Sequence, residues 1–276
     1  MPSSPDNIIQ IKAKILSHKK IAPGYFLLKL DAPAIAKLSL PGQFVHLRVL
    51  DSDIPLLRRP FSLHRINPDS IELLYQLKGE GTRILSERKK DEMVDLIGPL
   101  GNGFDLTDIP EGKNIVLIGG GIGTAPLVTL TEGLLKRYDR AKLTFFLGAR
   151  SQELILGEGE IRHSGIDCLI STDDGSYGEK GPVTRLFEKK LTDWKGKPGM
   201  VFTCGPKGML KVMGSLSRRF KFPCQVSLEE NMGCGIGVCL GCAVRIRTNQ
   251  GRDESFEYKR VCKDGPVFWA SEVIFD

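Results

Sequence analysis

Long hydrophobic runs are missing from this chain of 276 residues. No uninterrupted apolar stretch approaches the roughly 20 residues that a membrane-spanning helix needs, so we expect no membrane partner. Residues 1–7 are polar and contain no apolar segment, which argues against a secretory signal peptide. Cysteine numbers seven, an odd count that does not suit a disulfide framework and favours a reducing compartment. We therefore expect a cytoplasmic protein.

A strong charge of one sign is missing too. The net charge is only +6, and the basic pairs are scattered without aromatic residues between them, so a nucleic-acid partner is not expected. Histidine is scarce, with 4 residues, and those at 46, 64 and 163 stand at no spacing typical of a catalytic triad or a zinc site. We predict no catalytic acid or base in this chain.

The chain is longer than a single hydrophobic core usually organises, so two or three domains are expected. The first, residues 8–103, contains short strand candidates separated by Pro, Gly and Asp turns, a pattern typical of a small β-barrel. Helical spacing is weak there except after Gly81. The strand candidates are residues 8–15, 25–30, 44–49 and 71–75.

Strands and helices alternate in the second predicted domain, residues 111–222. The unbroken apolar run 114–118 is typical of a buried parallel strand. Further strand candidates are 142–147, 167–170 and 200–204, and helical stretches lie near 125–137, 182–190 and 207–219. This alternation predicts a parallel α/β sheet that binds ligands at the carboxyl ends of its strands. Residues 223–276 form the third predicted domain, with a strand candidate at 243–247.

Three cysteines of this last segment, Cys234, Cys239 and Cys242, stand in C-x4-C-x2-C spacing, and 19 residues separate Cys242 from Cys262. This is the spacing of plant-type [2Fe–2S] clusters, whose fourth thiolate comes from further along the chain. A loop around a cluster needs positive φ angles and N–H groups that point at sulfur, which glycine permits. Glycines stand at 233, 235, 237 and 241. Zinc is the alternative, but structural zinc usually draws cysteines as two short-spaced pairs.

In the predicted barrel, the sequence Arg59-Pro60-Phe61-Ser62 follows a proline-containing turn. Arginine offers a planar fork for a pyrophosphate, an aromatic ring can lie against a flat ring system, and a hydroxyl can bond to a heteroatom of that ring. Leu74-Tyr75-Gln76 then precedes Gly81-Thr82 at a predicted helix start, where bare N–H groups can bind a second anion. An ordinary turn is the alternative for the first motif taken alone.

Glycines follow the first predicted parallel strand, in Gly119-Gly120-Gly121-Ile122-Gly123-Thr124-Ala125-Pro126. No G-x-G-x-x-G register fits, and no acidic residue ends the next strand, so this is not the dinucleotide fingerprint. The glycines still let a phosphate approach a helix N-terminus, with packing in a tight turn as the alternative. The candidate nucleotide-binding residues are Gly120, Gly121, Gly123 and Thr124, together with Cys204, Gly205 and Pro206 at the end of a later strand, where a nicotinamide would lie.

Two carboxylates, Asp173 and Asp174, close another predicted strand at the same edge of the sheet. They can bind ribose hydroxyls and disfavour a 2′-phosphate, which favours NAD over NADP. A solvated turn is the alternative, and Arg150 at the end of the neighbouring strand could accept a 2′-phosphate.

In their order, these motifs resemble the ferredoxin-reductase superfamily over the first 222 residues. The segments 227–242 and 260–268 are similar to those of the electron-transfer subunit of B-type, NAD-dependent dihydroorotate dehydrogenase. The sequences GPLGNGF at 98–104 and DDGSYG at 173–178 agree with that family. The resemblance covers nearly the whole chain, and its cysteine segment is the most specific part.

The resemblance implies a multidomain β + α/β protein with an N-terminal FAD-binding β-barrel, a parallel-sheet NAD-binding domain and a small C-terminal [2Fe–2S] module. It implies an electron-transfer function in pyrimidine biosynthesis, with NAD as an exchangeable cosubstrate. The implied partner is an FMN-containing catalytic subunit that oxidises dihydroorotate, in a heterotetramer of two of each. The implied FAD residues are Arg59, Pro60, Phe61, Ser62, Leu74, Tyr75, Gln76, Gly81 and Thr82, and the cluster ligands are Cys234, Cys239, Cys242 and Cys262.

One departure from the family is the gap before Cys262, which is longer than usual, and we expect its polar insert around 248–257 to be a surface hairpin. The apolar residues Ile236, Val238 and Leu240 and the sequence Val267-Phe268-Trp269 are expected either at an interface or in the core of the small module.

Other functions stay open at this point. The small subunit of a flavin-bifurcating NADH–ferredoxin NADP transhydrogenase, or of a sulfide or sulfite reductase, is the main alternative, although the bifurcating type tends to replace one cluster cysteine with aspartate. A stand-alone oxygenase reductase would carry a ferredoxin domain of ~90 residues, and the 54 residues from Pro223 onward are too few. A zinc scaffold without enzymatic activity is the last alternative.

Overall fold

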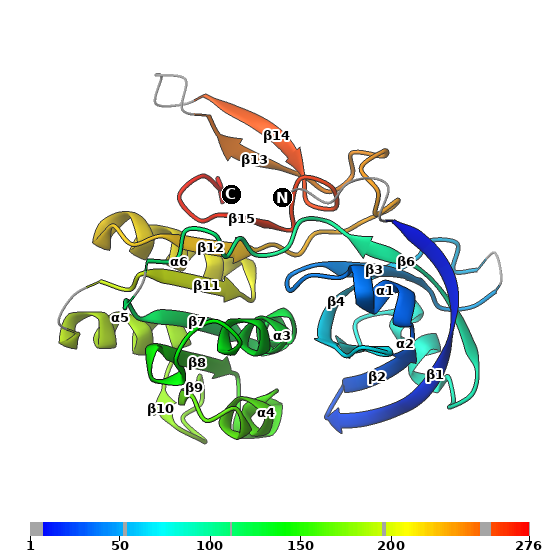
Figure 1. Ribbon diagram of the computed structural model, residues 1–276, viewed down its shortest axis with the longest axis horizontal. Coiled ribbons are helices and arrows are strands. Elements are labelled where there is room, and N and C mark those ends of the chain that lie inside the picture. The colour runs from blue at the N-terminus through cyan, green and yellow to red at the C-terminus, as the bar shows by residue number, and fades with distance from the viewer. Residues whose placement is uncertain (1–7, 52–53, 111, 195–196, 249–254, 276) are drawn as a thin grey trace.

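The computed structural model describes residues 8–51, 54–110, 112–194, 197–248 and 255–275. Two sheets organise these residues, a closed antiparallel barrel and a seven-stranded sheet, and a two-stranded hairpin lies beyond them (Figure 1). The predicted order of a β-barrel followed by a parallel-sheet domain is confirmed. Within the described ranges, no helix has the length and apolar character needed to cross a membrane.

The barrel strands follow the order β1-β2-β5-β4-β3-β6 around the closed sheet. Alternating side chains explain its core, because Ala13 and Ile15 point inward while Lys12 and Lys14 face solvent. The elements are β1 (Ile9–Ala22), β2 (Tyr25–Asp31), α1 (Pro33–Leu38), β3 (Phe44–Arg48), β4 (Arg59–Ile66), β5 (Ser70–Gln76), α2 (Glu80–Glu87) and β6 (Met93–Leu100). The predicted helix after Gly81 is therefore present, while β4 and β6, which hold the prolines Pro60 and Pro99, were not among the strand candidates.

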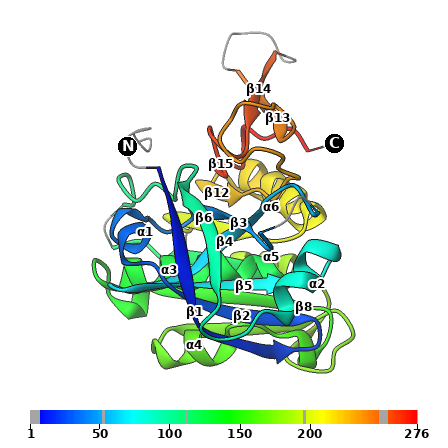
Figure 2. The same cartoon turned by 90° about the vertical axis from the view of Figure 1, so that its right-hand side faces the viewer.

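The seven-stranded sheet has the order β10-β9-β8-β7-β11-β12-β15, with its first six strands parallel. Every residue of β7 is buried, as its unbroken apolar run predicted. Between the strands lie four helices and short 3-10 turns (Figure 2). The elements are β7 (Ile115–Gly120), α3 (Thr124–Leu135), β8 (Leu143–Ala149), α4 (Glu158–His163), β9 (Asp167–Thr172), β10 (Glu179–Lys180), α5 (Val183–Asp193), β11 (Met200–Cys204) and α6 (Lys207–Phe220).

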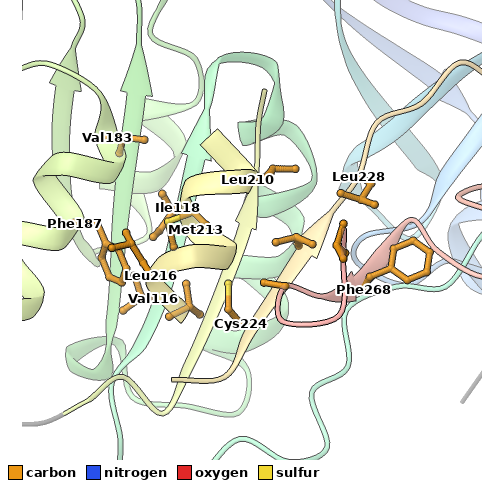
Figure 3. Packing of buried hydrophobic residues seen from close by; sticks show 14 of the residues in the cluster. Val116, Ile118, Val183, Phe187, Leu210, Met213, Leu216, Cys224, Leu228 and Phe268 are labelled. Atoms are coloured by element: carbon orange, nitrogen blue, oxygen red, sulfur yellow. The ribbon is translucent and has the colours of Figure 1, made fainter. Parts of the chain in front are cut away.

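Helices cover both faces of this sheet. Val116 and Ile118 pack with residues of α5 and α6 on one face, whereas Ile115 and Leu117 pack with α3 and α4 on the other. Figure 3 shows the first of these layers, in which Leu228 and Phe268 continue the apolar packing toward the C-terminal segment. The core of the sheet is therefore continuous with the segment that carries the cysteines.

The C-terminal segment begins and ends on the sheet. Its strands β12 (Cys224–Ser227) and β15 (Val267–Trp269) pair with each other antiparallel, and β12 pairs with β11. Phe268 is buried, so its side chain belongs to the core rather than to an interface. Between them, β13 (Ala243–Arg247) and β14 (Phe256–Arg260) pair antiparallel. Of the insert around 248–257 that is expected to form a surface hairpin, residues 249–254 lie outside the described residues.

A polar network joins the barrel to the α/β domain. Arg65 on β4 contacts Glu132 on α3 at 2.9 Å and Glu160 on α4 at 3.1 Å. The buried ring of His64 reaches Glu160 at 3.1 Å and the carbonyl oxygen of Ala125 at 3.3 Å. These contacts fix the start of α3, which follows the glycine-rich turn, against the strand that begins with Arg59.

Candidate functional site

A cavity of about 520 Å³ lies between the barrel and the segment that leads into the cysteines. All of the predicted flavin residues line this one cavity, although they come from three separate elements. They are Arg59, Pro60, Phe61 and Ser62 on β4, Leu74, Tyr75 and Gln76 on β5, and Gly81 and Thr82 on α2. The structure thus brings together residues of β4, β5 and α2 that are separated along the chain by the turns between these elements.

Arg59 and the start of α2 form one polar end of the cavity. A Cβ atom on Gly81 would lie 2.6 Å from Nε of Arg59, so the absence of a side chain at residue 81 leaves room for the guanidinium to cross the helix start. The hydroxyl of Thr82 accepts hydrogen bonds from the N–H groups of Lys78 at 3.0 Å and Gly79 at 3.1 Å, and thus stabilises the helix start. First-turn N–H groups of a helix lack partners within the helix, so this end is suited to an anion.

Tyr75 stabilises the cavity wall and does not offer its hydroxyl. Its ring is buried and stacks on Phe26 with centroids 5.5 Å apart, and it meets Phe61 edge-on at 5.4 Å. The hydroxyl lies 2.9 Å from Nε2 of His18, and burial raises the pKa of Tyr75. The hydroxyl that is left for a ligand at this wall is that of Ser62, which is half-buried and lines the cavity.

Several of the residues that line this cavity were not predicted from the sequence. Glu229 is the most informative of them, because its carboxyl lies 3.9 Å from Nζ of Lys78 at the cavity with 48% of its side chain exposed. The only signal in the sequence was that Glu229 and Glu230 directly precede the cysteine segment. The residues missed are Phe44, Lys78, Gly79, Glu80, Ile122, Ala125, Leu228, Glu229, Glu230, Asn231, Met232 and Pro266. The cavity is therefore shared by the barrel, the glycine-rich turn and the approach to the cysteines.

The glycine-rich turn packs on the end of β11. A Cβ atom on Gly123 would lie 2.3 Å from the carbonyl oxygen of Cys204, and one on Gly120 would lie 2.6 Å from Sδ of Met209. Gly121 differs, because its φ is +54° and an added Cβ would meet nothing within 4 Å. Two of the predicted glycines thus permit close packing, the alternative stated above, and only Gly121 faces open space.

The remaining nucleotide candidates lie at the carboxyl ends of the same sheet. Cys204 is buried beside the turn, and Gly205 and Pro206 line a second cavity of about 600 Å³ next to the first. Asp173 is exposed after β9, and its N–H bonds to the carbonyl of Ala149 at 3.0 Å. Asp174 accepts hydrogen bonds from the hydroxyl and N–H of Ser176, which lower the pKa of its carboxyl, so Asp174 stabilises a turn.

Thr124 begins α3 directly after the glycine-rich turn, and its buried hydroxyl has no hydrogen-bond partner among the described residues. Arg150 follows β8, and its carbonyl accepts the N–H of Asp174 at 3.2 Å. The three residues considered for the choice between NAD and NADP, Asp173, Asp174 and Arg150, therefore lie at one corner of the sheet.

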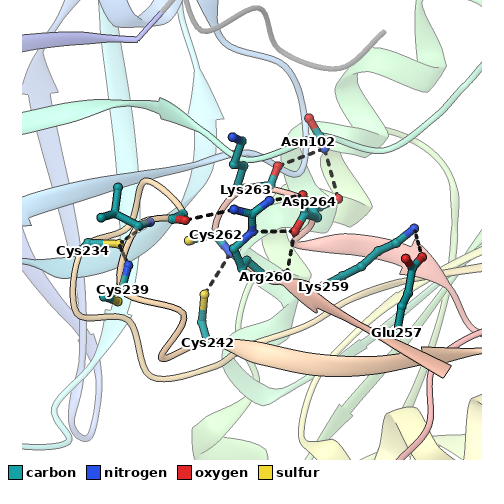
Figure 4. A network of polar contacts seen from close by, with 12 residues as sticks. Asn102, Cys234, Cys239, Cys242, Glu257, Lys259, Arg260, Cys262, Lys263 and Asp264 are labelled. Carbon is teal, nitrogen blue, oxygen red and sulfur yellow. Dashed lines mark hydrogen bonds and ion pairs between the residues drawn. The ribbon is translucent and has the colours of Figure 1, made fainter.

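The four predicted cluster cysteines form two pairs (Figure 4). The sulfur of Cys234 accepts the N–H of Cys239 at 3.4 Å, and the thiols of these two residues contact each other. The sulfur of Cys242 accepts the N–H of Cys262 at 3.4 Å, and their thiols are likewise in contact. No three ligating side chains of the described residues converge as a single metal ion requires. Two pairs suit two irons that each take two thiolates.

Backbone N–H groups lower the pKa of the Cys234 thiol. Burial alone would raise the pKa of Cys234, but N–H donors from Cys239, Ile236 and Val238 outweigh burial and lower the pKa to about 6. For Cys262, burial and the neighbouring Cys242 raise the pKa to about 12. The loop therefore has N–H groups pointing at sulfur, as a bound anionic cluster requires.

Backbone conformation in this loop agrees in part with the prediction from its glycines. Gly235 and Gly237 have φ angles of +72° and +84°, and the third positive φ, +62°, belongs to Leu240 rather than to Gly241. Gly233 and Gly241 instead lie against the sulfur of Cys239, 3.4 Å and 3.6 Å from where their Cβ atoms would be. Gly235 and Gly237 are thus required by their φ angles, whereas a Cβ atom on Gly233 or Gly241 would make only an ordinary van der Waals contact with this sulfur.

Asn102 and Arg260 hold the Cys262 turn, and neither was predicted. Arg260 pairs with both carboxylate oxygens of Asp264 at 2.9 and 3.1 Å, and it donates to the carbonyl of Gly237 at 3.1 Å. The amide of Asn102, at the end of the barrel, donates to the carbonyls of Lys263 and Asp264 at 3.2 and 3.1 Å. The GPLGNGF motif, noted only as a family feature, thus joins the barrel to the fourth cysteine.

Two family models match the chain, the iron-sulfur cluster binding domain of dihydroorotate dehydrogenase B at residues 229–274 and the oxidoreductase NAD-binding domain at 117–214. The electron transfer subunit of dihydroorotate dehydrogenase B (NAD(+)) from Desulforamulus reducens is 41% identical over 96% of this chain and 98% of its own length. The same subunit from Caldanaerobacter subterraneus is 38% identical over 96% and 99%. The chain belongs to this family of electron transfer subunits.

Solved structures agree with the family in fold. A chain of the NADH-dependent reduced ferredoxin-NADP oxidoreductase, a structure concerned with flavin-based electron bifurcation, superposes with a TM-score of 0.82 at 30% identity, over 96% of this chain and 90% of that one. A ferredoxin NADP+ reductase from Neisseria gonorrhoeae, solved with bound FAD and NADP, superposes with a TM-score of 0.65 at 18% identity, over 76% and 91%. The latter shows the fold alone.

Proposed function

We propose that this chain is the NAD-linked half of a dihydroorotate dehydrogenase B and passes electrons between a partner subunit and NAD. The observation that carries the proposal is the pairing of the cysteines beside the cavity of about 520 Å³, with residues 228–232 lining that cavity and leading directly into Cys234. One continuous segment thus joins a flavin-sized cavity to a two-iron ligand set.

FAD is the proposed occupant of the cavity, and when bound it can exchange a hydride with a nicotinamide and single electrons with an iron–sulfur cluster. Arg59 and the N–H groups at the start of α2 bind the pyrophosphate. Phe61 and Tyr75 form an apolar wall, and Ser62 offers a hydroxyl to a heteroatom of the flat ring. None of these residues gains or loses a proton in the transfer.

A [2Fe–2S] cluster is the proposed ligand of Cys234, Cys239, Cys242 and Cys262, and the donor set fits it by chemistry and by its division into pairs. The chain supplies the thiolates, the N–H donors of residues 236–239 and the clamp that Arg260 and Asp264 form around the fourth cysteine. These groups stabilise negative charge in a loop of which one member, Cys239, is exposed.

NAD is the proposed cosubstrate, held at the carboxyl ends of β7, β9 and β11. Gly121 and Thr124 would receive the phosphates, while Gly120 and Gly123 pack the turn against β11 and the start of α6. Asp173 would receive a ribose, and Cys204, Gly205 and Pro206 the nicotinamide side. A comparison of kcat/KM for NADH and NADPH tests the preference. The proposal expects NADH to be favoured, and a preference for NADPH would assign the corner to Arg150 instead of Asp173.

The partner in this proposal is an FMN-containing subunit that carries the dihydroorotate site, in a heterotetramer of two of each. Support comes from the exposed apolar side chains beside Cys239, because Val238 is 74% and Leu240 62% exposed. An exposed apolar rim around a redox site suits a stable interface. In this arrangement residues 8–103 hold FAD, residues 111–222 bind NAD, and residues 223–276 hold the cluster and face the partner.

The absorbance spectrum and composition of the purified chain test the proposal directly. We expect one FAD, two irons and two inorganic sulfides per chain, and oxidation of NADH with an artificial acceptor. Zinc in place of iron, or a colourless protein, would refute it. A bifurcating transhydrogenase subunit would have the same composition, so a coupled assay with dihydroorotate is needed to separate the two.

A further inference from the structure

His46 is a buried histidine that no part of the proposed function yet uses. It lies on β3 with its side chain 1% exposed, and neither ring nitrogen has a hydrogen-bond partner among the described residues. The other buried barrel histidine, His64, has both nitrogens within 3.3 Å of an acceptor. Leaving a buried polar group without a partner costs about 1–3 kcal/mol, so such a group needs a specific reason.

The ring of His46 lies directly under the cluster loop. A Cβ atom on Gly235 would be 2.6 Å from Nδ1 and 2.9 Å from Cγ of His46, and the φ of Gly235 is +72°. Two backbone groups face the ring nitrogens, those of Cys234 and Arg58, although neither forms a hydrogen bond of good geometry with them. Glycine at 235 is therefore required twice, by its backbone angle and by the ring beneath it, and this packing brings the ring nitrogens next to the first cluster ligand.

The same strand reaches the flavin cavity. Phe44, two residues before His46 and on the same face of β3, lines that cavity and pairs with Ser62, while His46 pairs with Pro60. Two residues of a strand span roughly 7 Å. One short stretch of β3 thus contacts the proposed flavin site at Phe44 and the proposed cluster site at His46.

We propose that His46 is a positioning residue for the cluster, which donates its ring N–H into the cluster site on the Cys234 side and holds that side of the loop against the barrel. The inference rests on the proposed function, because it needs a cluster at these cysteines. A neutral imidazole carries one N–H donor, and hydrogen bonds to the sulfurs of an iron–sulfur centre are among the factors that set its reduction potential. Such a donor stabilises the reduced, more negative state.

Two variants of the full chain test the proposal. His46→Phe keeps a ring and removes both nitrogens, whereas His46→Gln keeps an amide N–H that can donate. Iron content, the electron paramagnetic resonance spectrum of the reduced protein and the cluster midpoint potential are measured for each, with FAD content as the check on folding. We expect His46→Phe to lower the potential by the equivalent of a tenfold change in the reduction equilibrium, 59 mV for one electron. His46→Gln should restore part of that shift.

His64→Phe is the matched control, since it removes an equally buried barrel histidine that faces the α/β domain, and it should leave the cluster potential unchanged. An unchanged potential and spectrum in His46→Phe would overturn the proposal, as would equal shifts in His46→Phe and His46→Gln, which would mean packing alone. If His46→Phe keeps FAD and loses iron, iron retained in His46→Gln supports the donor role and iron lost in both refutes it. A wild-type chain without iron would instead refute the proposed function.

Discussion

Cys239 is exposed whereas Cys242 and Cys262 are buried, so the proposed cluster ligands span the range from surface to core. Replacing any one of Cys234, Cys239, Cys242 and Cys262 by Ser should lower the iron content and bleach the visible charge-transfer bands. The reason is that all four thiolates are needed for two irons with two ligands each. Iron analysis and absorbance spectra measure this. Cys168→Ser is the control, since that thiol packs beside the core of the α/β domain and should leave iron unchanged. Full iron in the Cys262 variant would remove it from the ligand set.

Arg59 offers a second test at the level of a single side chain. Arg59→Ala removes a charge-assisted contact to a pyrophosphate, worth about 1.5–3 kcal/mol, and should weaken FAD binding roughly ten- to a hundredfold while the barrel stays folded. FAD content after gel filtration and the Kd for added FAD measure the effect. Arg83→Ala is the matched control, because Arg83 lies on α2, the helix whose start borders the same end of the cavity, and pairs there with Glu87 on the exposed face. Equal FAD retention in both variants would contradict the role of Arg59.

Which residues the sequence could reveal depends on how close their signals lie along the chain. Arg59 and the cysteines stand in compact motifs, and the structure brings each motif together as expected. Asn102 and His46 could not be found that way, because their partners are respectively about 160 and 190 residues away. Only the folded chain places the barrel end and β3 against the cluster loop.

Among the elements, the parallel strands with a clear apolar run were predicted, whereas β4 and β6, of eight residues each, were missed. The runs that became β7, β8, β9 and β11 are rich in apolar residues, which is typical of buried parallel strands. β12 and β15 have four and three residues, too few for an alternating pattern. They are strands because β12 pairs with the edge of β11 and β15 pairs with β12. Tertiary pairing decided these elements.

The contact between the glycine-rich turn and β11 predicts a strong effect of one added methyl group. Gly123→Ala would place Cβ 2.3 Å from the carbonyl oxygen of Cys204. This oxygen is a backbone atom and cannot move away as the end of a flexible side chain could. We expect a loss of about 1–3 kcal/mol of stability and a higher KM for NADH, measured by thermal unfolding and by NADH oxidation with an artificial acceptor.

Gly159→Ala in α4 is the control for this substitution, because an added Cβ meets nothing within 4 Å and helix propensity favours alanine by about 1 kcal/mol. It should leave Tm unchanged or higher. If Gly123→Ala also left Tm unchanged or higher, the contact between the glycine-rich turn and the end of β11 would not depend on close packing.

For the whole molecule, the network of His64, Arg65 and Glu160 predicts how acid weakens the joint between the two large domains. Burial alone would raise the pKa of Glu160, but the hydrogen bond from His64 and the charges of His64 and Arg65 outweigh it and lower the pKa. A lowered carboxyl pKa stabilises the fold above the ordinary value of 4.5, and that contribution is lost as the pH falls below it.

When the pH is lowered from about 6 to about 4, the Tm of Glu160→Gln should therefore fall less than the Tm of the wild type. This range brackets the ordinary glutamate pKa. Unfolding followed by fluorescence at each pH measures this. Glu188→Gln is the control, since Glu188 pairs with Arg219 on the surface within one domain and should keep the wild-type acid dependence. Identical curves for all three proteins would show that the network does not couple the domains.

The arrangement of the whole chain was predictable in its order of domains and not in their joints. Along the sequence, strand candidates separated by turns predicted the barrel, and the alternation of strands and helices that follows predicted the parallel sheet. The C-terminal segment, in contrast, shares a sheet with the α/β domain through β12 and β15, and the cavity draws on all three parts. Whether residue 223 is a domain boundary stays a prediction.

The central claim is that this chain is half of an enzyme, and the coupled reaction tests it most directly. Dihydroorotate-dependent reduction of NAD⁺ is measured for the chain alone, for the FMN-containing dihydroorotate dehydrogenase subunit from the same cell, and for their mixture. We expect turnover only in the mixture, and we expect Cys239→Ser to abolish it while NADH oxidation with an artificial acceptor persists. Dihydroorotate turnover by this chain alone, or no coupled activity in a mixture of fully loaded subunits, would contradict the account.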